Sequence, residues 1–168
     1  MNRSGERQRL LTQTGESQDM GREKIRIGII GAGRIAGFVH MPSLKLCPDL
    51  CEVVAVASRT KEKAKAFAEQ WGIPRVHSDW TALLADPEVD AAVICPPSGL
   101  THSVAKAAIA AGKHILCEKP LGLNFSEARE LQVAAEHAGI THMVAFTFRF
   151  VPGLRYLKRL VGEGHFGE

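Results

Sequence analysis

The stretch "IRIGIIGAGRIAG", residues 25–37, decides how this chain folds. A short apolar run, typical of a strand, leads through a G-x-G-x-x-A turn into a helical pattern. In this context the first glycine permits a tight turn, the second lets the backbone approach a pyrophosphate, and the alanine lets helix and strand pack closely. The free N–H groups at the start of the helix favour phosphate binding. Glycines that serve only a tight turn are the alternative, but the strand–turn–helix context favours a dinucleotide site formed by Gly31, Gly33, Arg34, Ile35 and Ala36.

From Lys24 onward, short apolar runs alternate with helical patterns. This alternation implies parallel strands joined by right-handed crossovers, with helices on both faces of one sheet. The sequence therefore predicts a doubly wound α/β domain with a parallel sheet over residues 24–150. Pro42 is expected to kink or interrupt the helix that follows the glycine turn, and Asp79 and Asn124 are expected to cap two later helices. The predicted strands are "IRIGII", "EVVAVA", "RVH", "VDAAVIC", "HILC" and "THMVAF".

Composition excludes several other classes of protein. The chain has 168 residues, of which 45% are hydrophobic and 23% charged, as in globular proteins. Its net charge of +3 is spread without a basic block, so nucleic-acid binding is not expected. No apolar run approaches the ~18 residues of a membrane-spanning helix. The four cysteines lack paired CxxC spacing, which favours reduced thiols in a cytoplasmic protein and predicts neither disulfides nor a metal site.

Residues 1–23 form a polar segment ahead of the first strand. They contain no hydrophobic core for a secretory signal, and Glu6, Glu16 and Asp19 argue against an organelle transit peptide. We expect this segment to be a disordered leader. Met20 is an alternative first residue of the natural protein.

The end of the second predicted strand bears on the choice of cofactor. In doubly wound folds an acidic residue here binds the ribose hydroxyls of NAD, whereas an arginine accommodates the 2′-phosphate of NADP. The chain offers no carboxylate before Glu62, and two hydroxyls and a guanidinium are suited to a phosphate. We therefore expect NADP as the cofactor, with NAD as the alternative. The other interpretation of the arginine is that it is solvated and contacts no cofactor. The residues concerned are Ser58, Arg59 and Thr60.

Two further strands end in unusual loops. Residues 96–102, "PPSGLTH", read as a stiff loop followed by a helix cap, and residues 118–120, "EKP", follow the strand "HILC". Each has a structural interpretation, because prolines end strands and the charges of Glu118 and Lys119 can simply be solvated. Ligands nevertheless bind outside the carboxyl ends of parallel strands, where both loops are expected.

In combination, these motifs resemble the N-terminal half of the Gfo/Idh/MocA family of oxidoreductases, typified by glucose–fructose oxidoreductase and inositol dehydrogenase. The resemblance runs from about Lys24 to the C-terminus and includes "GKHILCEKPL" and "FTFRFVP". It implies a Rossmann fold and hydride transfer between a sugar-like or polyol-like hydroxyl and a nicotinamide dinucleotide.

The resemblance also implies roles for individual residues. Lys119 would be the active-site lysine, and Pro120 would follow a cis peptide bond. Ser98 and Thr147 stand where family members commonly have asparagine, whereas Arg149 matches the family. The residues that would adjoin the ribose and nicotinamide are Pro96, Pro97, Ser98, His102, Glu118, Lys119 and Arg149.

The family takes the other half of its active site, including a D-x-x-x-H motif, from a second domain. That motif is absent here, since Val161 stands four residues before His165. Residues 151–168 are therefore expected to be a linker and the start of a truncated second domain. A non-catalytic nucleotide-binding or sensing module that acts through a partner is the alternative. Apolar residues that would normally face the second domain predict association, such as a homo-oligomer, through Phe146, Phe148 and Phe150.

Overall fold

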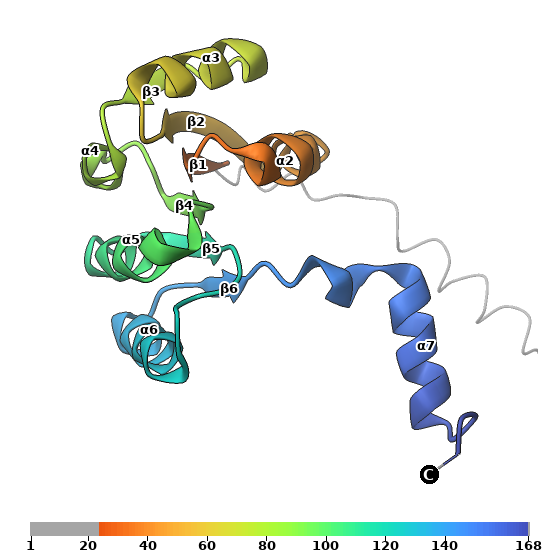
Figure 1. The fold of residues 1–168 in the computed structure, drawn as a ribbon. Coiled ribbons are helices and arrows are strands. Elements are labelled where there is room, and N and C mark those ends of the chain that lie inside the picture. The colour runs from red at the N-terminus through yellow and green to blue at the C-terminus, as the bar shows by residue number, and fades with distance from the viewer. Residues whose placement is uncertain (1–23, 168) are drawn as a thin grey trace, which may run out of the picture.

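Parallel strands build the centre of the structure, a computed structural model that describes residues 24–167 (Figure 1). The strand order is β3-β2-β1-β4-β5-β6 in one six-stranded sheet. This order confirms the predicted doubly wound fold, while the predicted leader lies outside the described residues. The strands are β1 (Ile25–Ile30), β2 (Cys51–Ala57), β3 (Arg75–His77), β4 (Ala91–Ile94), β5 (His114–Cys117) and β6 (His142–Val144).

Helical segments connect the strands and extend beyond the last one. They are η1 (Ala36–His40), α2 (Met41–Lys45), α3 (Lys61–Trp71), α4 (Trp80–Ala85), α5 (Ser98–Ala110), α6 (Phe125–Ala138), η2 (Thr147–Phe150) and α7 (Pro152–Gly162).

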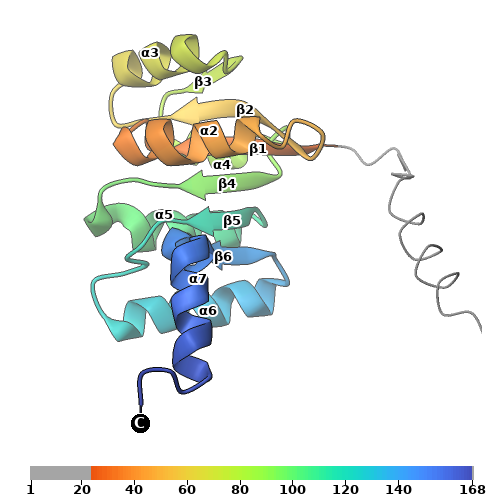
Figure 2. The same cartoon turned by 90° about the vertical axis from the view of Figure 1, so that its right-hand side faces the viewer.

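The register of the sheet aligns the strand ends. Ile30 at the end of β1 pairs with Ala57 of β2 and with Ile94 of β4, and Ile94 in turn pairs with Cys117 of β5. Figure 2 shows these strands side by side and running in one direction. The strand order reverses between β1 and β4, which is where open α/β sheets bind ligands. Loops after β1, β2, β4 and β5 therefore share one edge.

Two apolar cores hold the helices on opposite faces of the sheet (Figure 1). On one face α4, α5 and α6 contribute Leu83, Val104 and Leu131. On the other face, η1, α2 and α3 contribute residues that include Met41 and Phe67. Burial of these apolar side chains supplies the main stabilisation of the domain.

Local sequence signals set the ends of two helices. Asp79 caps α4, because its Oδ1 accepts a hydrogen bond from the N–H of Ala82 at 2.9 Å. Hydrogen bonds from the Thr81 hydroxyl and from this N–H lower the pKa of Asp79 to about 2. Asn124 caps α6 in the same way, with the N–H of Glu127 at 3.0 Å, as predicted.

Two details of the helices differ from the predictions. The predicted interruption at Pro42 is wrong, because the helix continues to Lys45 with a π-helical segment, η1, just ahead of the proline, while the kink stays a prediction. A wider turn accommodates a residue that has no N–H to donate and whose ring crowds the preceding turn. The "PPSGLTH" loop is also shorter than predicted, since α5 begins at Ser98 with Pro97 as its N-cap.

The segment beyond β6 is largely exposed to solvent. Phe146, Phe148 and Phe150 are 60%, 76% and 60% exposed, which confirms the predicted exposure of these rings. None of the residues of α7 is buried, and Figure 1 shows this helix standing clear of the sheet. No helix in the described part of the chain has the length and apolarity to cross a membrane.

Candidate functional site

Gly31 forms the turn at the end of β1. Its φ of 103° lies in the left-handed region that favours glycine, and its N–H donates to the carbonyl oxygen of Ala57 at 2.9 Å. A Cβ at this position would lie 2.5 Å from the carbonyl oxygen of Cys95. The turn therefore fits between the ends of β2 and β4 only because this residue has no side chain.

Gly33 begins the helix next to open space. Its N–H donates to the carbonyl oxygen of Gly31 at 2.8 Å, and a Cβ here would meet no atom within 4 Å. The N–H of Gly37 bonds to Gly33 O at 3.1 Å, and the three N–H groups between them have no intrahelical acceptor. Open space in front of free N–H groups fits a pyrophosphate, which these groups, at Arg34, Ile35 and Ala36, would bind.

Backbone hydrogen bonds bring the loops after β4 and β5 to the glycine turn. The N–H of Cys95 donates to Ile30 O at 2.9 Å, and the N–H of Glu118 donates to Ile94 O at 2.8 Å. The Cys95 thiol lies 3.3 Å from the carbonyl oxygen of Gly31. The glycine turn, the Cys95–Pro96 segment and the Glu118–Lys119 turn thus form one continuous edge.

Both thiols at this edge are held in their neutral form. Burial, and then the charge of Glu118, raise the pKa of Cys95 and of Cys117 to about 12. A thiol with such a pKa supplies almost no thiolate near pH 7, and the thiolate is the nucleophilic form. These cysteines are therefore structural and do not supply a nucleophile.

Glu118 and Lys119 are neighbours in sequence but differ in their surroundings. Lys119 is exposed, and its peptide bond to Pro120 is cis, as the resemblance implied. The Glu118 side chain is only 13% exposed and lies 2.9 Å from Nε2 of His40, whose side chain is 6% exposed. Because a carboxylate can only accept hydrogen bonds, His40 is the donor in this pair.

Sequence reasoning missed His40. It belongs to "GFVHMP", where a single polar residue follows apolar ones on a helix expected to pack against the sheet. A histidine in such a setting is a weak signal without its partner, which lies 78 residues further along the chain.

The other predicted residues lie after β2, in α5 and in η2. Ser58 is half-buried after β2, whereas Arg59 and Thr60 are exposed at the start of α3. Thr60 is the N-cap of that helix and makes no side-chain capping bond. His102 lies one turn into α5 and contacts Glu130 of α6 at 2.9 Å, while Arg149 lies exposed in η2 beyond β6. Within residues 24–167 no side-chain hydrogen bond or ion pair joins His102 to the Glu118–Lys119 turn, and its contact with the ribose stays a prediction.

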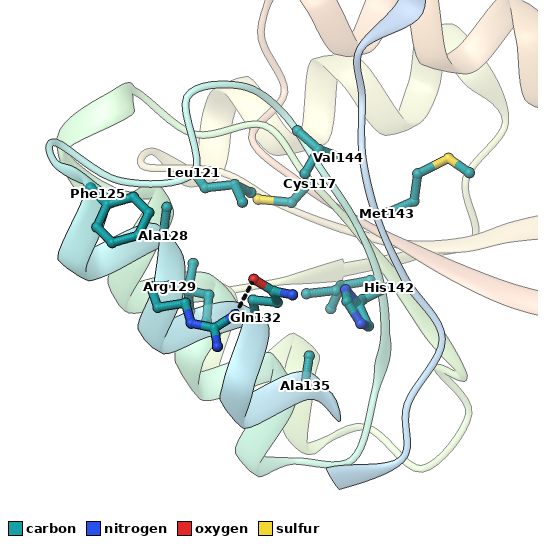
Figure 3. A pocket seen from close by; sticks show the side chains of 12 residues that line it. Cys117, Leu121, Phe125, Ala128, Arg129, Gln132, Ala135, His142, Met143 and Val144 are labelled. Carbon is teal, nitrogen blue, oxygen red and sulfur yellow. Dashed lines mark hydrogen bonds between the residues drawn. The ribbon is translucent and has the colours of Figure 1, made fainter. Parts of the chain in front are cut away.

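A separate hollow lies between helix α6 and strands β5 and β6 (Figure 3). Its volume is about 430 Å³, and apolar side chains such as Leu121, Phe125 and Ala128 line most of it. Arg129 points along the groove and donates to Gln132 at 2.9 Å. It contains none of the residues predicted at the cofactor. Within residues 24–167, no group of three or more His, Cys, Asp and Glu residues is arranged to hold a metal ion.

Known proteins that are similar in sequence include oxidoreductases and dehydrogenases. An uncharacterized oxidoreductase of Bacillus subtilis is 35% identical over 145 residues, 86% of this chain and 42% of its own length. Mouse trans-1,2-dihydrobenzene-1,2-diol dehydrogenase is 34% identical over 144 residues, 86% of this chain and 43% of its own length. The chain thus spans less than half the length of these relatives.

Solved structures give the same picture. A 3-ketoreductase from Actinomadura kijaniata, in complex with NADP and TDP-benzene, superposes with a TM-score of 0.80 at 36% identity, covering 86% of this chain and 44% of its own. The family model of oxidoreductases with an NAD-binding Rossmann fold matches residues 25–146, well over half of the chain. This chain therefore belongs to the Gfo/Idh/MocA oxidoreductase family and carries its NAD-binding Rossmann fold.

Proposed function

We propose that this chain binds NADP along the edge formed by the loops after β1, β2, β4 and β5, and presents Lys119 for hydride transfer. The observation that carries the proposal is the hydrogen-bonded continuity between the glycine turn and the Glu118–Lys119 turn. A dinucleotide whose pyrophosphate lies at Gly33 would extend one way to Arg59 and the other way to Lys119.

The adenosine end of the cofactor would meet the residues after β2. Arg59 and Thr60 are exposed there, and Glu62 is the nearest following carboxylate. A guanidinium and hydroxyls suit the 2′-phosphate that distinguishes NADP from NAD. The 3-ketoreductase from Actinomadura kijaniata, solved with NADP, supports this preference.

The nicotinamide end would meet the residues after β4 and β5. When bound, the nicotinamide supplies the hydride acceptor or donor. An exposed lysine amine at the neighbouring turn can take the proton of a substrate hydroxyl, or donate one to a carbonyl oxygen in the reverse direction. Pro97, Ser98 and Glu118 would orient the ribose beside it, with further contacts from Pro96, His102 and Arg149.

The substrate we propose is a small polyhydroxylated molecule that resembles a sugar or polyol. Two relatives support this class, because one is a diol dehydrogenase and the other a 3-ketoreductase. Both names describe interconversion at a carbon that bears oxygen, which is the reaction that a hydride carrier and a proton carrier perform together. The whole enzyme's activity would also need residues outside this domain, including a second proton carrier.

Titration of the purified chain with NADPH and NADH, followed by nicotinamide fluorescence, tests the cofactor proposal. We expect saturable NADPH binding and at least roughly tenfold weaker NADH binding, because one charge-assisted phosphate contact contributes about 1.5–3 kcal/mol. Equal affinities would contradict the NADP preference, and absence of binding would contradict the site.

Lys119→Met separates binding from chemistry. We expect this variant to bind NADPH nearly as well as the unmodified chain, because Lys119 lies beyond the phosphate contacts, and to lose any polyol-dependent reduction of NADP. Tight cofactor binding with no such reduction in the unmodified chain would favour the alternative of a non-catalytic nucleotide-binding module.

A further inference from the structure

The buried contact between His40 and Glu118 joins the two halves of the proposed site. Nε2 of His40 lies 2.9 Å from Oε1 of Glu118, and the two side chains are 6% and 13% exposed. His40 is the last residue of η1, within the helix that follows the glycine turn, and Glu118 begins the turn that carries Lys119. A direct contact therefore links the proposed phosphate-binding helix to the proposed catalytic lysine's own loop.

The π-helical geometry of η1 turns His40 toward the sheet. The N–H of Met41 donates to the carbonyl oxygen of Ala36, five residues earlier, in place of the four-residue step of an α-helix. With this wider turn, Ala36, His40 and Met41 are all buried on the inner side of the helix. Single π-helical turns inside helices occur frequently at functional sites.

Two neighbouring side chains can donate a hydrogen bond to the Glu118 carboxylate, that of His40 and that of the adjacent Lys119. Among the described residues, the only side chain that bonds to the Glu118 carboxylate is that of His40. Lys119 follows directly in sequence, is exposed, and makes no ion pair within residues 24–167. The thiols nearby, half-buried Cys95 and buried Cys117, are neutral and do not compete for the histidine.

We propose that His40 is a positioning residue that holds the Glu118 carboxylate inward and thereby keeps the Lys119 amine free of its acidic neighbour. The proposal rests on the proposed role of Lys119 only for its functional meaning, since the arrangement itself is independent of any cofactor. Without the histidine, Glu118 would lose its buried partner, and a carboxylate that swings outward would pair with Lys119. Ion pairing favours the ammonium form of a lysine, which neither accepts a proton nor acts as a nucleophile.

Competitive acetylation measures this effect directly. The chain is treated with a limiting amount of acetic anhydride at fixed pH, and mass spectrometry gives the rate at Lys119 relative to that at exposed Lys65 on α3. In His40→Leu we expect the relative rate at Lys119 to fall roughly threefold, which corresponds to an exposed ion pair of ~0.7 kcal/mol. His40→Gln, which keeps a donor for Glu118, should retain most of the rate, and His40→Leu/Glu118→Gln should restore it.

The matched control is His77→Leu, which removes a histidine–carboxylate contact of similar length, 3.0 Å to Asp86, from a part of the sheet not assigned to the site. This control should leave the rate at Lys119 unchanged. An unchanged rate in folded His40→Leu would overturn the inference.

Glu118→Gln provides a second test that leaves His40 intact and still applies if His40→Leu fails to fold. Because His40 already holds the carboxylate away from Lys119, this change should alter the acetylation rate by less than about twofold. A severalfold rise would mean that Glu118 pairs with Lys119 in solution, and would contradict the inference. No cofactor enters either measurement, so failure of NADPH binding would contradict the proposed function without affecting this result.

Discussion

Gly31 and Gly33 are needed at the glycine turn for different reasons. Gly31 is required by its backbone angle and by the carbonyl of Cys95, whereas Gly33 faces open space. Gly33→Ala should therefore leave the thermal unfolding temperature nearly unchanged but weaken NADPH binding, because the added methyl group would occupy the approach to the pyrophosphate.

Gly31→Ala is the matched change at the same turn. It should lower the free energy of unfolding by about 1–3 kcal/mol, the cost of an unfavourable backbone angle, before any effect on the cofactor is considered. Urea unfolding and fluorescence titration of both variants check the pair. Equal NADPH affinity in Gly33→Ala and the unmodified chain would contradict the placement of the pyrophosphate.

In the proposed site, Arg59 would determine the preference between NADP and NAD. Arg59→Asp should weaken NADPH binding about tenfold or more and leave NADH binding unchanged or improved, because the new carboxylate repels a 2′-phosphate and can accept from ribose hydroxyls. Arg129→Asp on α6 makes the same change of charge beside the apolar groove and should affect neither affinity. If Arg59→Asp left the ratio of the two affinities unaltered, the arginine would be a solvated surface residue.

At the scale of single elements, a capping residue determines where helix α6 begins. The side-chain oxygen of Asn124 accepts a hydrogen bond from the N–H of Glu127. This N–H is one of the donors that the start of α6 would otherwise leave unpaired. Asn124→Ala should lower the free energy of unfolding by about 1 kcal/mol, measured as a shift of the urea midpoint. Ser126→Ala, in the first turn of the same helix, serves as the control and should have a smaller effect.

An ion pair joins the beginnings of β1 and β4. The guanidinium of Arg26 contacts both carboxylate oxygens of Asp90, at 2.9 and 2.6 Å, and hydrogen bonding by Arg26 lowers the pKa of Asp90 below its ordinary value. A lowered pKa in the folded state means that the pair stabilises the fold above the ordinary pKa of an aspartate, about 3.9. This stabilisation is lost as the pH falls through the lowered value.

Urea unfolding as a function of pH tests this pair. The unmodified chain should lose stability as the pH falls below about 4, and Asp90→Asn should be less stable at pH 7 but show a shallower fall. Asp49→Asn removes a carboxyl group from an exposed loop and should keep the slope of the unmodified chain. Identical slopes in Asp90→Asn and the unmodified chain would show that the pair does not contribute.

The order of the elements could be predicted because each depends on local pattern. Alternating apolar runs specified all the strands, and Asp79 and Asn124 marked the starts of α4 and α6. The π-helical segment and the early start of α5 were not predicted, because both depend on how a proline is accommodated by its neighbours. The contact between His40 and Glu118 could not be predicted at all, since it requires the register of the sheet and the rotation of η1 together.

At the scale of the whole molecule, the site is assembled where separate segments meet. The glycine turn, the residues after β2 and the Lys119 turn come from distant parts of the chain, and the parallel register brings their strand ends to one edge. Two apolar hollows of the described residues lie elsewhere, along α6. The proposed site therefore rests on the chemistry of its residues and not on either of these hollows.

The exposed apolar segment beyond β6 has a consequence for the whole molecule. Phe148 is 76% exposed, between two further phenylalanines that are each 60% exposed, and the following helix continues the apolar surface with Leu154 and Leu157. An apolar surface of this kind promotes association of copies of the chain. We therefore expect the chain to associate in a concentration-dependent way that sedimentation velocity detects.

Replacing the exposed phenylalanines with serine should shift this equilibrium toward the monomer, because less apolar surface would leave water on association. Leu46→Ser removes an apolar side chain that is 83% exposed in the loop after α2, far along the chain from this segment, and should leave the association unchanged. A monodisperse monomer at all concentrations would contradict the prediction. An equal response to both replacements would show that association depends on overall apolar surface and has no preferred site beyond β6.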